Sequence, residues 1–290
     1  MKGRTDTPWW VRYLVFLMAM GLAGVILLVP LANVLFRAFS GGLGAYFGAL
    51  ADPDTVHAVF LTLFVAVVSV VFNTVFGVAA AWAIGKYSFR GKALLVTLID
   101  LPFSVSPVIS GLIFVLLFGA PSALGRWLDG HNVQILFATP GIVVATLFVT
   151  FPFVAREVLP IMEATGTDQE EAALTLGASP WQTFRHVTLP TVKWGVIYGV
   201  LLCTARAIGE FGAVAVVSGK IAGKTDTMSL RVEKLYQEYQ GRAAFAVATL
   251  FLGLAVVTLV LKSAVEWRVK RALREAAPST GSGQAPSEAA

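Results

Sequence analysis

The sequence predicts an all-helical integral membrane protein with six transmembrane helices. Of its 290 residues, 57% are hydrophobic and 13% are charged, whereas soluble domains carry about 25% charged residues. Six apolar segments are long enough to cross a bilayer, which takes roughly 20 residues per helix. A chain this apolar could not keep its surface in water, so a soluble domain is excluded. Nucleic-acid binding is disfavoured because no basic face is left free of the membrane.

The six predicted spans follow one another along the chain, and the third contains helix-breaking residues. They cover residues 13–36, 56–84, 93–118, 135–155, 193–218 and 243–261. Asp100, Pro102 and Pro107 lie in the early part of the third span, where we expect a kink or a break. The segments between the spans are predicted loops.

The basic residues orient the chain with both termini in the cytoplasm. Segments that this orientation places inside hold 14 Lys and Arg residues, counting Lys193 at the inner end of the fifth span, and the loops outside hold seven. Such a bias is typical of cytoplasmic loops. The predicted organisation is a cytoplasmic N-terminus at residues 1–12, a six-span domain at 13–262 with a cytoplasmic loop at 156–192, and a cytoplasmic tail at 263–290. The tail is rich in Ala, Pro, Ser and Gly and is predicted to be disordered from about residue 276.

The loop at residues 156–192 is the one long polar interruption of the chain. Thr167 and Glu170 have the spacing of a capping box for a first short helix that runs through Leu176. Gly177 then supplies the positive φ that a chain often needs on leaving a helix.

A second short helix is predicted directly after this glycine. Ser179 is its N-cap and Pro180 its first residue, and the helix should stop before Pro190. The result is two short helices joined by a glycine elbow, with small side chains that allow another surface to approach closely. An ordinary hairpin loop between two spans fits these residues as well.

The spacing of this loop resembles a known pattern. Glu171-Ala-Ala, three residues, Gly177, nine residues and Val187-x-Leu-Pro190 resemble the signature loop of ABC importer permeases, with Val where the pattern has Ile. The resemblance implies that the hairpin is a coupling helix seated in a groove of a separate ATPase subunit. The residues it assigns to this contact are Glu171, Ala172, Ala173, Gly177, Ala178, Ser179 and Pro180.

Two charges lie inside the predicted fifth span. Arg206 and Glu210 are one helical turn apart on the same face, and each charge at bilayer depth costs about 2.5–3.5 kcal/mol. The pair must therefore face protein or water. It is either a structural ion pair that locks the spans together or a polar group on a translocation path, with Arg206 attracting an anion. Asp100 is a second candidate for the path, against a role in supporting the helix break.

These charges lie in a motif that narrows the family. Arg206-Ala-x-Gly-Glu210-Phe-Gly resembles the oxyanion branch of the permeases, which handles sulfate, thiosulfate, molybdate and tungstate. The segments at 100–107 and 230–236 are most similar to its sulfate and thiosulfate permeases, and the resemblance covers roughly residues 13–270. It implies a type I importer permease of the inner membrane that moves sulfate or thiosulfate into the cytoplasm by alternating access. A molybdate or tungstate permease and a stand-alone secondary anion carrier are the alternatives.

The resemblance also implies partners and no cofactor in this chain. The partners are a homologous permease, two ATPase subunits that bind ATP and Mg, and an extracytoplasmic sulfate-binding protein. The stretch at 218–225 nearly matches a phosphate-binding loop, but its first Gly is Ser and no strand precedes it. We find no metal-ligand cluster and no catalytic residues, so we expect a transport subunit rather than an enzyme.

One external segment has an apolar face at helical spacing. The face is formed by Met228, Val232, Leu235, Tyr236 and Tyr239. Such a helix could lie flat on the outer surface and help to seat a binding protein, or it could be an ordinary solvated loop helix.

Overall fold

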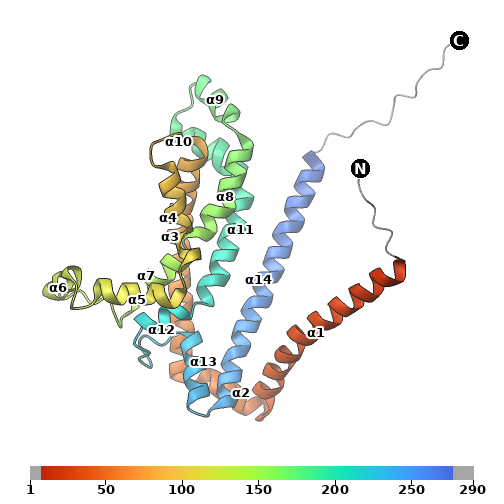
Figure 1. Ribbon diagram of the computed structural model, residues 1–290, viewed down its shortest axis with the longest axis vertical. Coiled ribbons are helices and arrows are strands. Elements are labelled where there is room, and N and C mark those ends of the chain that lie inside the picture. Colours follow the sequence, from red (N-terminus) through yellow and green to blue (C-terminus); the bar gives the residue numbers. More distant parts are fainter. Residues whose placement is uncertain (1–7, 277–290) are drawn as a thin grey trace. The chain divides into compact units, whose positions relative to one another are not determined.

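A computed structural model describes residues 8–276 of the chain, with side chains as far as residue 268. Every regular element in this part is a helix (Figure 1), as the composition predicted. Lys2 and Arg4 of the predicted N-terminal segment, and the tail predicted to be disordered, lie outside the described residues. The helices are α1 (Trp9–Phe39), α2 (Gly42–Ala51), α3 (Pro53–Lys86), α4 (Lys92–Ser104), α5 (Pro107–Phe118), α6 (Ala123–Gly130), α7 (Thr139–Thr150), α8 (Pro152–Thr165), α9 (Asp168–Thr175), α10 (Pro180–Thr183), the π-helix η1 (Phe184–Thr188), α11 (Leu189–Ile208), α12 (Gly212–Val217), α13 (Met228–Gln237) and α14 (Gly241–Ala276).

The long helices are those of a membrane protein. Five helical stretches in the described part are long and apolar enough to cross a bilayer, and α4 with α5 makes a sixth if the two count as one broken span. The large apolar side chains along α1 are mostly exposed. Side chains of this kind need a lipid environment, because exposing so large a contiguous apolar surface to water is unfavourable. The chain is therefore a multi-pass membrane protein.

Two helices extend beyond the predicted spans. The fourth span was predicted to end at Ala155, but Pro152 begins α8 and that helix runs on to Thr165. The sixth was predicted to end at Leu261, and α14 continues to Ala276. Two predicted loops contain the helices α2 and α6, and α13 lies on the external segment whose spacing predicted a helix.

The third and fifth spans are both interrupted. The third breaks after Ser104, and Ser106 precedes Pro107 at the start of α5. A proline at a first helical position loses no intrahelical hydrogen bond, so the new helix begins there at little cost. The fifth was predicted as one helix from 193 to 218, but α11 ends at Ile208 and α12 starts only at Gly212.

The chain divides into two compact units. The first comprises residues 1–69, 105–149 and 207–254, and the second comprises residues 70–104, 150–206 and 255–290. Helices α3 and α14 therefore contribute residues to both units.

Glycines bring the helices of the second unit close together. A Cβ on Gly77 of α3 would lie 2.9 Å from Val154 Cβ and 3.1 Å from the Ala155 backbone nitrogen of α8. A Cβ on Gly199 of α11 would lie 3.0 Å from the Cα of Val154. Small residues of this kind let helix backbones approach within a bilayer, where van der Waals contact drives association. Asn73 of α3 adds a buried hydrogen bond, donating its amide to Thr150 Oγ1 at 2.8 Å.

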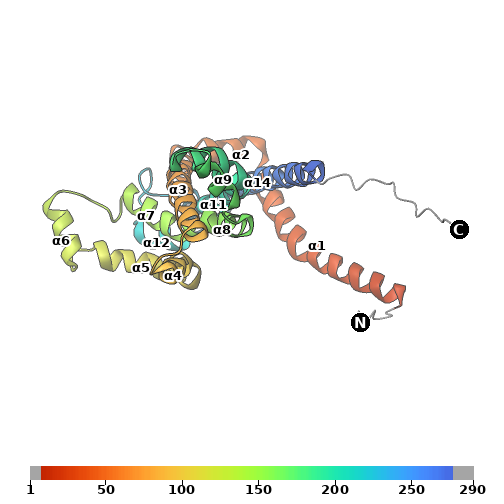
Figure 2. The ribbon, with the colours of Figure 1, turned by 90° about the horizontal axis from the view of Figure 1, so that it is seen from above.

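In the first unit, glycines likewise allow close contact between α5 and α12, which lie side by side (Figure 2). A Cβ on Gly212 would lie 3.0 Å from Pro107 Cβ, and one on Gly111 would lie 2.8 Å from the Ala213 carbonyl oxygen. Gly212, the last residue of the motif that begins at Arg206, thus lies close against α5.

Helix α13 is bound into the core of the first unit. The Met228 N–H donates to Thr62 Oγ1 at 2.8 Å, and the buried Arg231 donates to Asp52 Oδ2 at 2.7 Å. Met228 and Leu235 are buried in the apolar cluster below the helix. The predicted apolar face is therefore not available as a surface at these two positions, although Tyr236 and Tyr239 are exposed.

We predict that Gly77→Val destabilises the protein in detergent, because its new side chain would overlap Val154 and the α8 backbone. Overpacking of this kind costs about 1–3 kcal/mol. Gly21→Val in α1 is the matched control, since a Cβ at Gly21 meets nothing within 4 Å. The free energy of unfolding, measured by denaturant titration in mixed micelles, should fall for Gly77→Val alone. Equal values for both variants would contradict the glycine packing.

A candidate docking hairpin

The polar loop folds into two short helices, α9 and α10, beyond the ends of α8 and α11 (Figure 1). The predicted capping box at the start of α9 is wrong. Thr167 occupies the N-cap position without a side-chain cap, and its hydroxyl donates to Glu171 Oε1 at 2.7 Å. Glu170 does not turn back to the cap, because its carboxylate pairs with Lys86 at 2.8 Å. The first turn of α9 still holds Asp168, Glu170 and Glu171, which suit the positive end of a helix.

The glycine elbow forms as predicted. Gly177 has φ +88°, and its N–H donates to the Leu174 carbonyl at 3.0 Å. The Ala178 N–H donates to the Ala173 carbonyl at 3.1 Å. These two bonds are those of a Schellman motif, which satisfies carbonyls that the helix end leaves open. The turn after α9 is therefore fixed by backbone hydrogen bonds rather than by a partner.

The second helix, α10, starts at the predicted residues, and the capping box of the hairpin is found at this helix start. Gln182 N–H donates to Ser179 Oγ at 3.3 Å, and Ser179 N–H donates to Gln182 Oε1 at 2.8 Å. Pro180 follows as the first helical residue. The C-terminal end of α9 and the start of α10 are thus both satisfied within the hairpin itself.

The second helix does not stop before Pro190. After α10 the chain widens into the π-helix η1, in which the Leu189 N–H donates to the Phe184 carbonyl, and then continues as α11. In a regular α-helix the ring of Pro190 would clash with the carbonyl of His186. A π-turn widens the helix before the proline, and such turns are frequent at functional sites.

The hairpin exposes apolar side chains that sequence reasoning missed. Leu176 is 88% exposed and Trp181 67% exposed, and Leu174 is also exposed. Among the residues assigned to docking, Glu171, Ala172, Gly177, Ser179 and Pro180 are exposed, and Ala173 and Ala178 are half-buried. The exposed leucines and tryptophan had no signal of their own, because helical periodicity predicts burial for such residues. A rigid polar hairpin with exposed apolar tips suits a protein contact.

A buried ion pair fastens the hairpin to α3. Glu170 Oε1 accepts from Lys86 Nζ and also from the Thr188 hydroxyl at 3.0 Å. Lys86 Nζ donates a second hydrogen bond to the Gly166 carbonyl between α8 and α9. Trp82 and Phe184 pack beside this group, with ring centroids 5.0 Å apart.

The three charged residues predicted inside the spans, Arg206, Glu210 and Asp100, lie in different surroundings. Arg206 lies in the last turn of α11 and is half-buried. Glu210 lies beyond the helix end, so the two do not share a helical face, and its buried carboxylate accepts from the Ala213 N–H at 2.9 Å at the start of α12. Asp100 accepts from Arg156 Nε of α8 at 2.7 Å. Its charge is thus paired beside the helix break.

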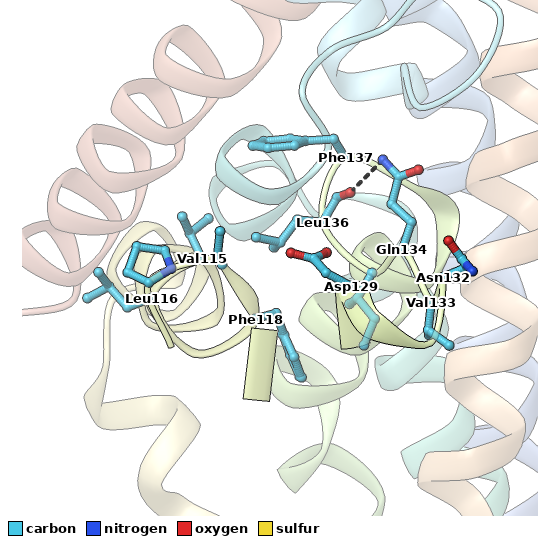
Figure 3. Close-up of a pocket in the computed structure, with 13 residues that line it drawn as sticks. Val115, Leu116, Phe118, Asp129, Asn132, Val133, Gln134, Leu136 and Phe137 are labelled. Atoms are coloured by element: carbon cyan, nitrogen blue, oxygen red, sulfur yellow. Dashed lines mark hydrogen bonds between the residues drawn. The ribbon is translucent and has the colours of Figure 1, made fainter. Parts of the chain in front are cut away.

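A cavity of about 590 Å³ lies in the first unit, and its lining does not favour an anion. Val115 and Phe118 form its apolar wall, and Asp129, Asn132 and Gln134 supply polar groups (Figure 3). The Gln134 amide already donates to the Leu136 carbonyl at 3.3 Å. A carboxylate facing the space would repel an anion. Across the described residues no group of three or more His, Cys, Asp or Glu side chains could hold a metal ion.

Comparison with known proteins identifies the family. Residues 73–272 match the family model described as "Binding-protein-dependent transport system inner membrane component". The chain belongs to this family. It is accordingly a membrane component of a transport system and not an enzyme.

Individual relatives of this permease cover nearly the whole chain. The sulfate transport system permease protein CysW of Escherichia coli is 47% identical over 270 residues, which are 92% of this chain and 93% of the relative. CysW of Synechococcus elongatus is 53% identical over 251 residues, covering 87% and 88% of the two chains. A crystal structure of a bacterial ABC transporter involved in the import of the acidic polysaccharide alginate contains a chain with the same fold. Its TM-score is 0.75 at 17% identity, with 89% of this chain and 95% of that chain covered.

We predict that Ser179→Ala loosens the start of α10 in the permease. The variant loses the cap of the Gln182 N–H, and such caps contribute about 1 kcal/mol. Backbone amides at 181–184 should exchange hydrogen about fivefold faster, as measured by mass spectrometry on the purified protein. Ser179→Asp, which can still cap, should exchange like the wild type. Unchanged exchange in Ser179→Ala would contradict the capping box.

Proposed function

We propose that this chain is the permease subunit of an ATP-driven importer that moves sulfate or thiosulfate into the cytoplasm. The observation that carries the proposal is the near full-length similarity to the CysW sulfate permeases of Escherichia coli and Synechococcus elongatus. The motif from Arg206 to Gly212 supports the same oxyanion branch. A molybdate or tungstate permease is the second candidate, since the chain offers no group known to distinguish these anions.

The proposed partners follow from the family and from the hairpin. A homologous permease, two ATPase subunits and an extracytoplasmic sulfate-binding protein would complete the importer, with ATP and Mg bound by the ATPases. The hairpin from Asp168 to Thr183 would dock on an ATPase through Leu176, Trp181 and the motif residues from Glu171 to Pro180. Closure of the ATPase pair would move the hairpin and switch the access of a central path by tilting the spans.

The proposed topology puts both termini and the hairpin in the cytoplasm, with six spans in the inner membrane. The distribution of Lys and Arg supports it, as does the docking role, since an ATPase that uses cellular ATP works on that side. The proposed organisation keeps a cytoplasmic N-terminus at 1–12, the permease domain at 13–262 and a cytoplasmic tail at 263–290, with α14 reaching into the tail as far as Ala276.

Arg206 and Glu210 are the proposed polar groups nearest to the translocation path. Each lies at an interruption of the fifth span, where backbone groups freed from the helix can line a water-filled space. Asp100 is a weaker candidate, because its ion pair with Arg156 favours the alternative role of supporting the helix break.

Uptake of labelled sulfate tests the proposed function. The four-subunit importer would be reconstituted in vesicles with its binding protein, with and without internal ATP, and with excess molybdate as competitor. We expect uptake to fall at least tenfold without ATP and to change little with molybdate. Uptake that persists without ATP would indicate a secondary carrier, and uptake abolished by molybdate would indicate the second candidate substrate.

Gly177→Val should abolish uptake and leave membrane insertion intact. A Cβ at Gly177 meets nothing within 4 Å, so the variant acts through its backbone at φ +88°, which a β-branched residue resists. Gly177→Asn is the matched control, because Asn tolerates this conformation, and it should retain most of the uptake. Normal uptake by Gly177→Val would contradict the role of the elbow in coupling.

A further inference from the structure

One carboxylate oxygen joins three elements of the second unit. Oε1 of Glu170 in α9 lies 2.8 Å from Lys86 Nζ at the end of α3 and accepts from Thr188 of η1 at 3.0 Å. The Lys86 and Glu170 side chains are only 6% and 13% exposed. We call Lys86, Glu170 and Thr188 the latch.

Lys86 also restrains the chain where the hairpin begins. Its second hydrogen bond goes to the carbonyl of Gly166, which has φ +65°. A glycine between two helices is a natural hinge, because it can change its backbone angles at low cost. With Lys86 in place, a force applied to α9 cannot simply be absorbed by rotation at this glycine.

Aromatic rings line a cavity beside the latch. The Trp82 ring centroid lies 5.5 Å from that of Tyr87 and 5.0 Å from that of Phe184. These rings and the buried Thr183 line a small cavity of about 240 Å³ together with the latch residues. An ion pair in such surroundings interacts more strongly than one in water, because the local dielectric constant is lower.

The two adjacent glutamates of α9 differ in exposure and in their partners, although both line this cavity. Glu171 is exposed and accepts only a local hydrogen bond from Thr167 among the bonds found for its side chain. Glu170 points inward to α3 and η1. The first is placed to meet a partner and the second to hold the hairpin to its own chain.

We propose that Glu170 is a positioning residue which, through Lys86 and Thr188, transmits displacement of the hairpin to α3 and α11. This inference rests on the proposed function and adds the route by which the hairpin moves the spans. α3 is reached through Lys86 in its last turn, and α11 through η1, which is continuous with it. Without the latch, what holds the hairpin to the spans includes its chain connections at Gly166 and η1 and the packing of Phe184 on Trp82 of α3.

The test replaces both charges at once. Lys86→Met or Glu170→Met alone would strand a buried charge and destabilise the protein, whereas replacing both partners of a buried ion pair by apolar residues is often neutral for stability. The matched control is Lys262→Met with Glu266→Met, which removes an exposed ion pair within α14. Each importer would be reconstituted with its partners, and ATP hydrolysis and sulfate uptake would be measured per assembled complex.

We expect the Lys86→Met/Glu170→Met importer to assemble and to hydrolyse ATP, with at least a tenfold loss of sulfate moved per ATP. The control should stay within twofold of the wild type. A merely structural role would lower the yield of complex but leave sulfate per ATP unchanged, and that result would overturn the proposal. Failure of the wild type to couple uptake to ATP would instead refute the proposed function.

Discussion

The place of the hairpin in the second unit depends on the buried ion pair between Lys86 and Glu170. This pair sets which side of α9 faces its own chain, and it thereby leaves Glu171, Leu176 and Trp181 on exposed positions. The hairpin needs no partner to keep its shape, because the Schellman motif at Gly177 and the capping box at Ser179 satisfy its helix ends. A preorganised contact of this kind binds without the entropy cost of ordering a loop.

Behind the hairpin, the spans of the second unit are held by close backbone approach rather than by large side chains. Gly77 and Gly199 let α3 and α11 lie against the same stretch of α8 around Val154. Interlocked surfaces of this kind are close-packed and transmit a displacement instead of absorbing it. The hairpin, the ion pair and the glycine contacts thus form a continuous series from an exposed surface to the membrane-spanning helices.

The sequence predicted those features that depend on neighbouring residues. The helical class and the position of most spans follow from hydropathy, and Gly177 and Ser179 behave as local rules require. The capping box at Thr167 failed because Glu170 is drawn to Lys86, which lies 84 positions earlier in the chain. A local rule cannot include a partner so distant in sequence.

The other incorrect predictions also arose where no local residue pattern marks the feature. Pro190 was expected to end a helix, but a π-turn before it accommodates the proline. No residue pattern in the sequence predicted that turn. The break between Ile208 and Gly212 was missed because the apolar run continues across it. Leu176 and Trp181 were not assigned to docking because apolar residues in a short helix are normally read as core.

An electron cryomicroscopy structure of the reconstituted importer would test the docking of the hairpin most directly. We expect Leu176 and Trp181 to be buried against an ATPase subunit while Glu170 still pairs with Lys86. A complex in which these two apolar side chains remain exposed, or in which the ATPase contacts another part of the chain, would contradict it.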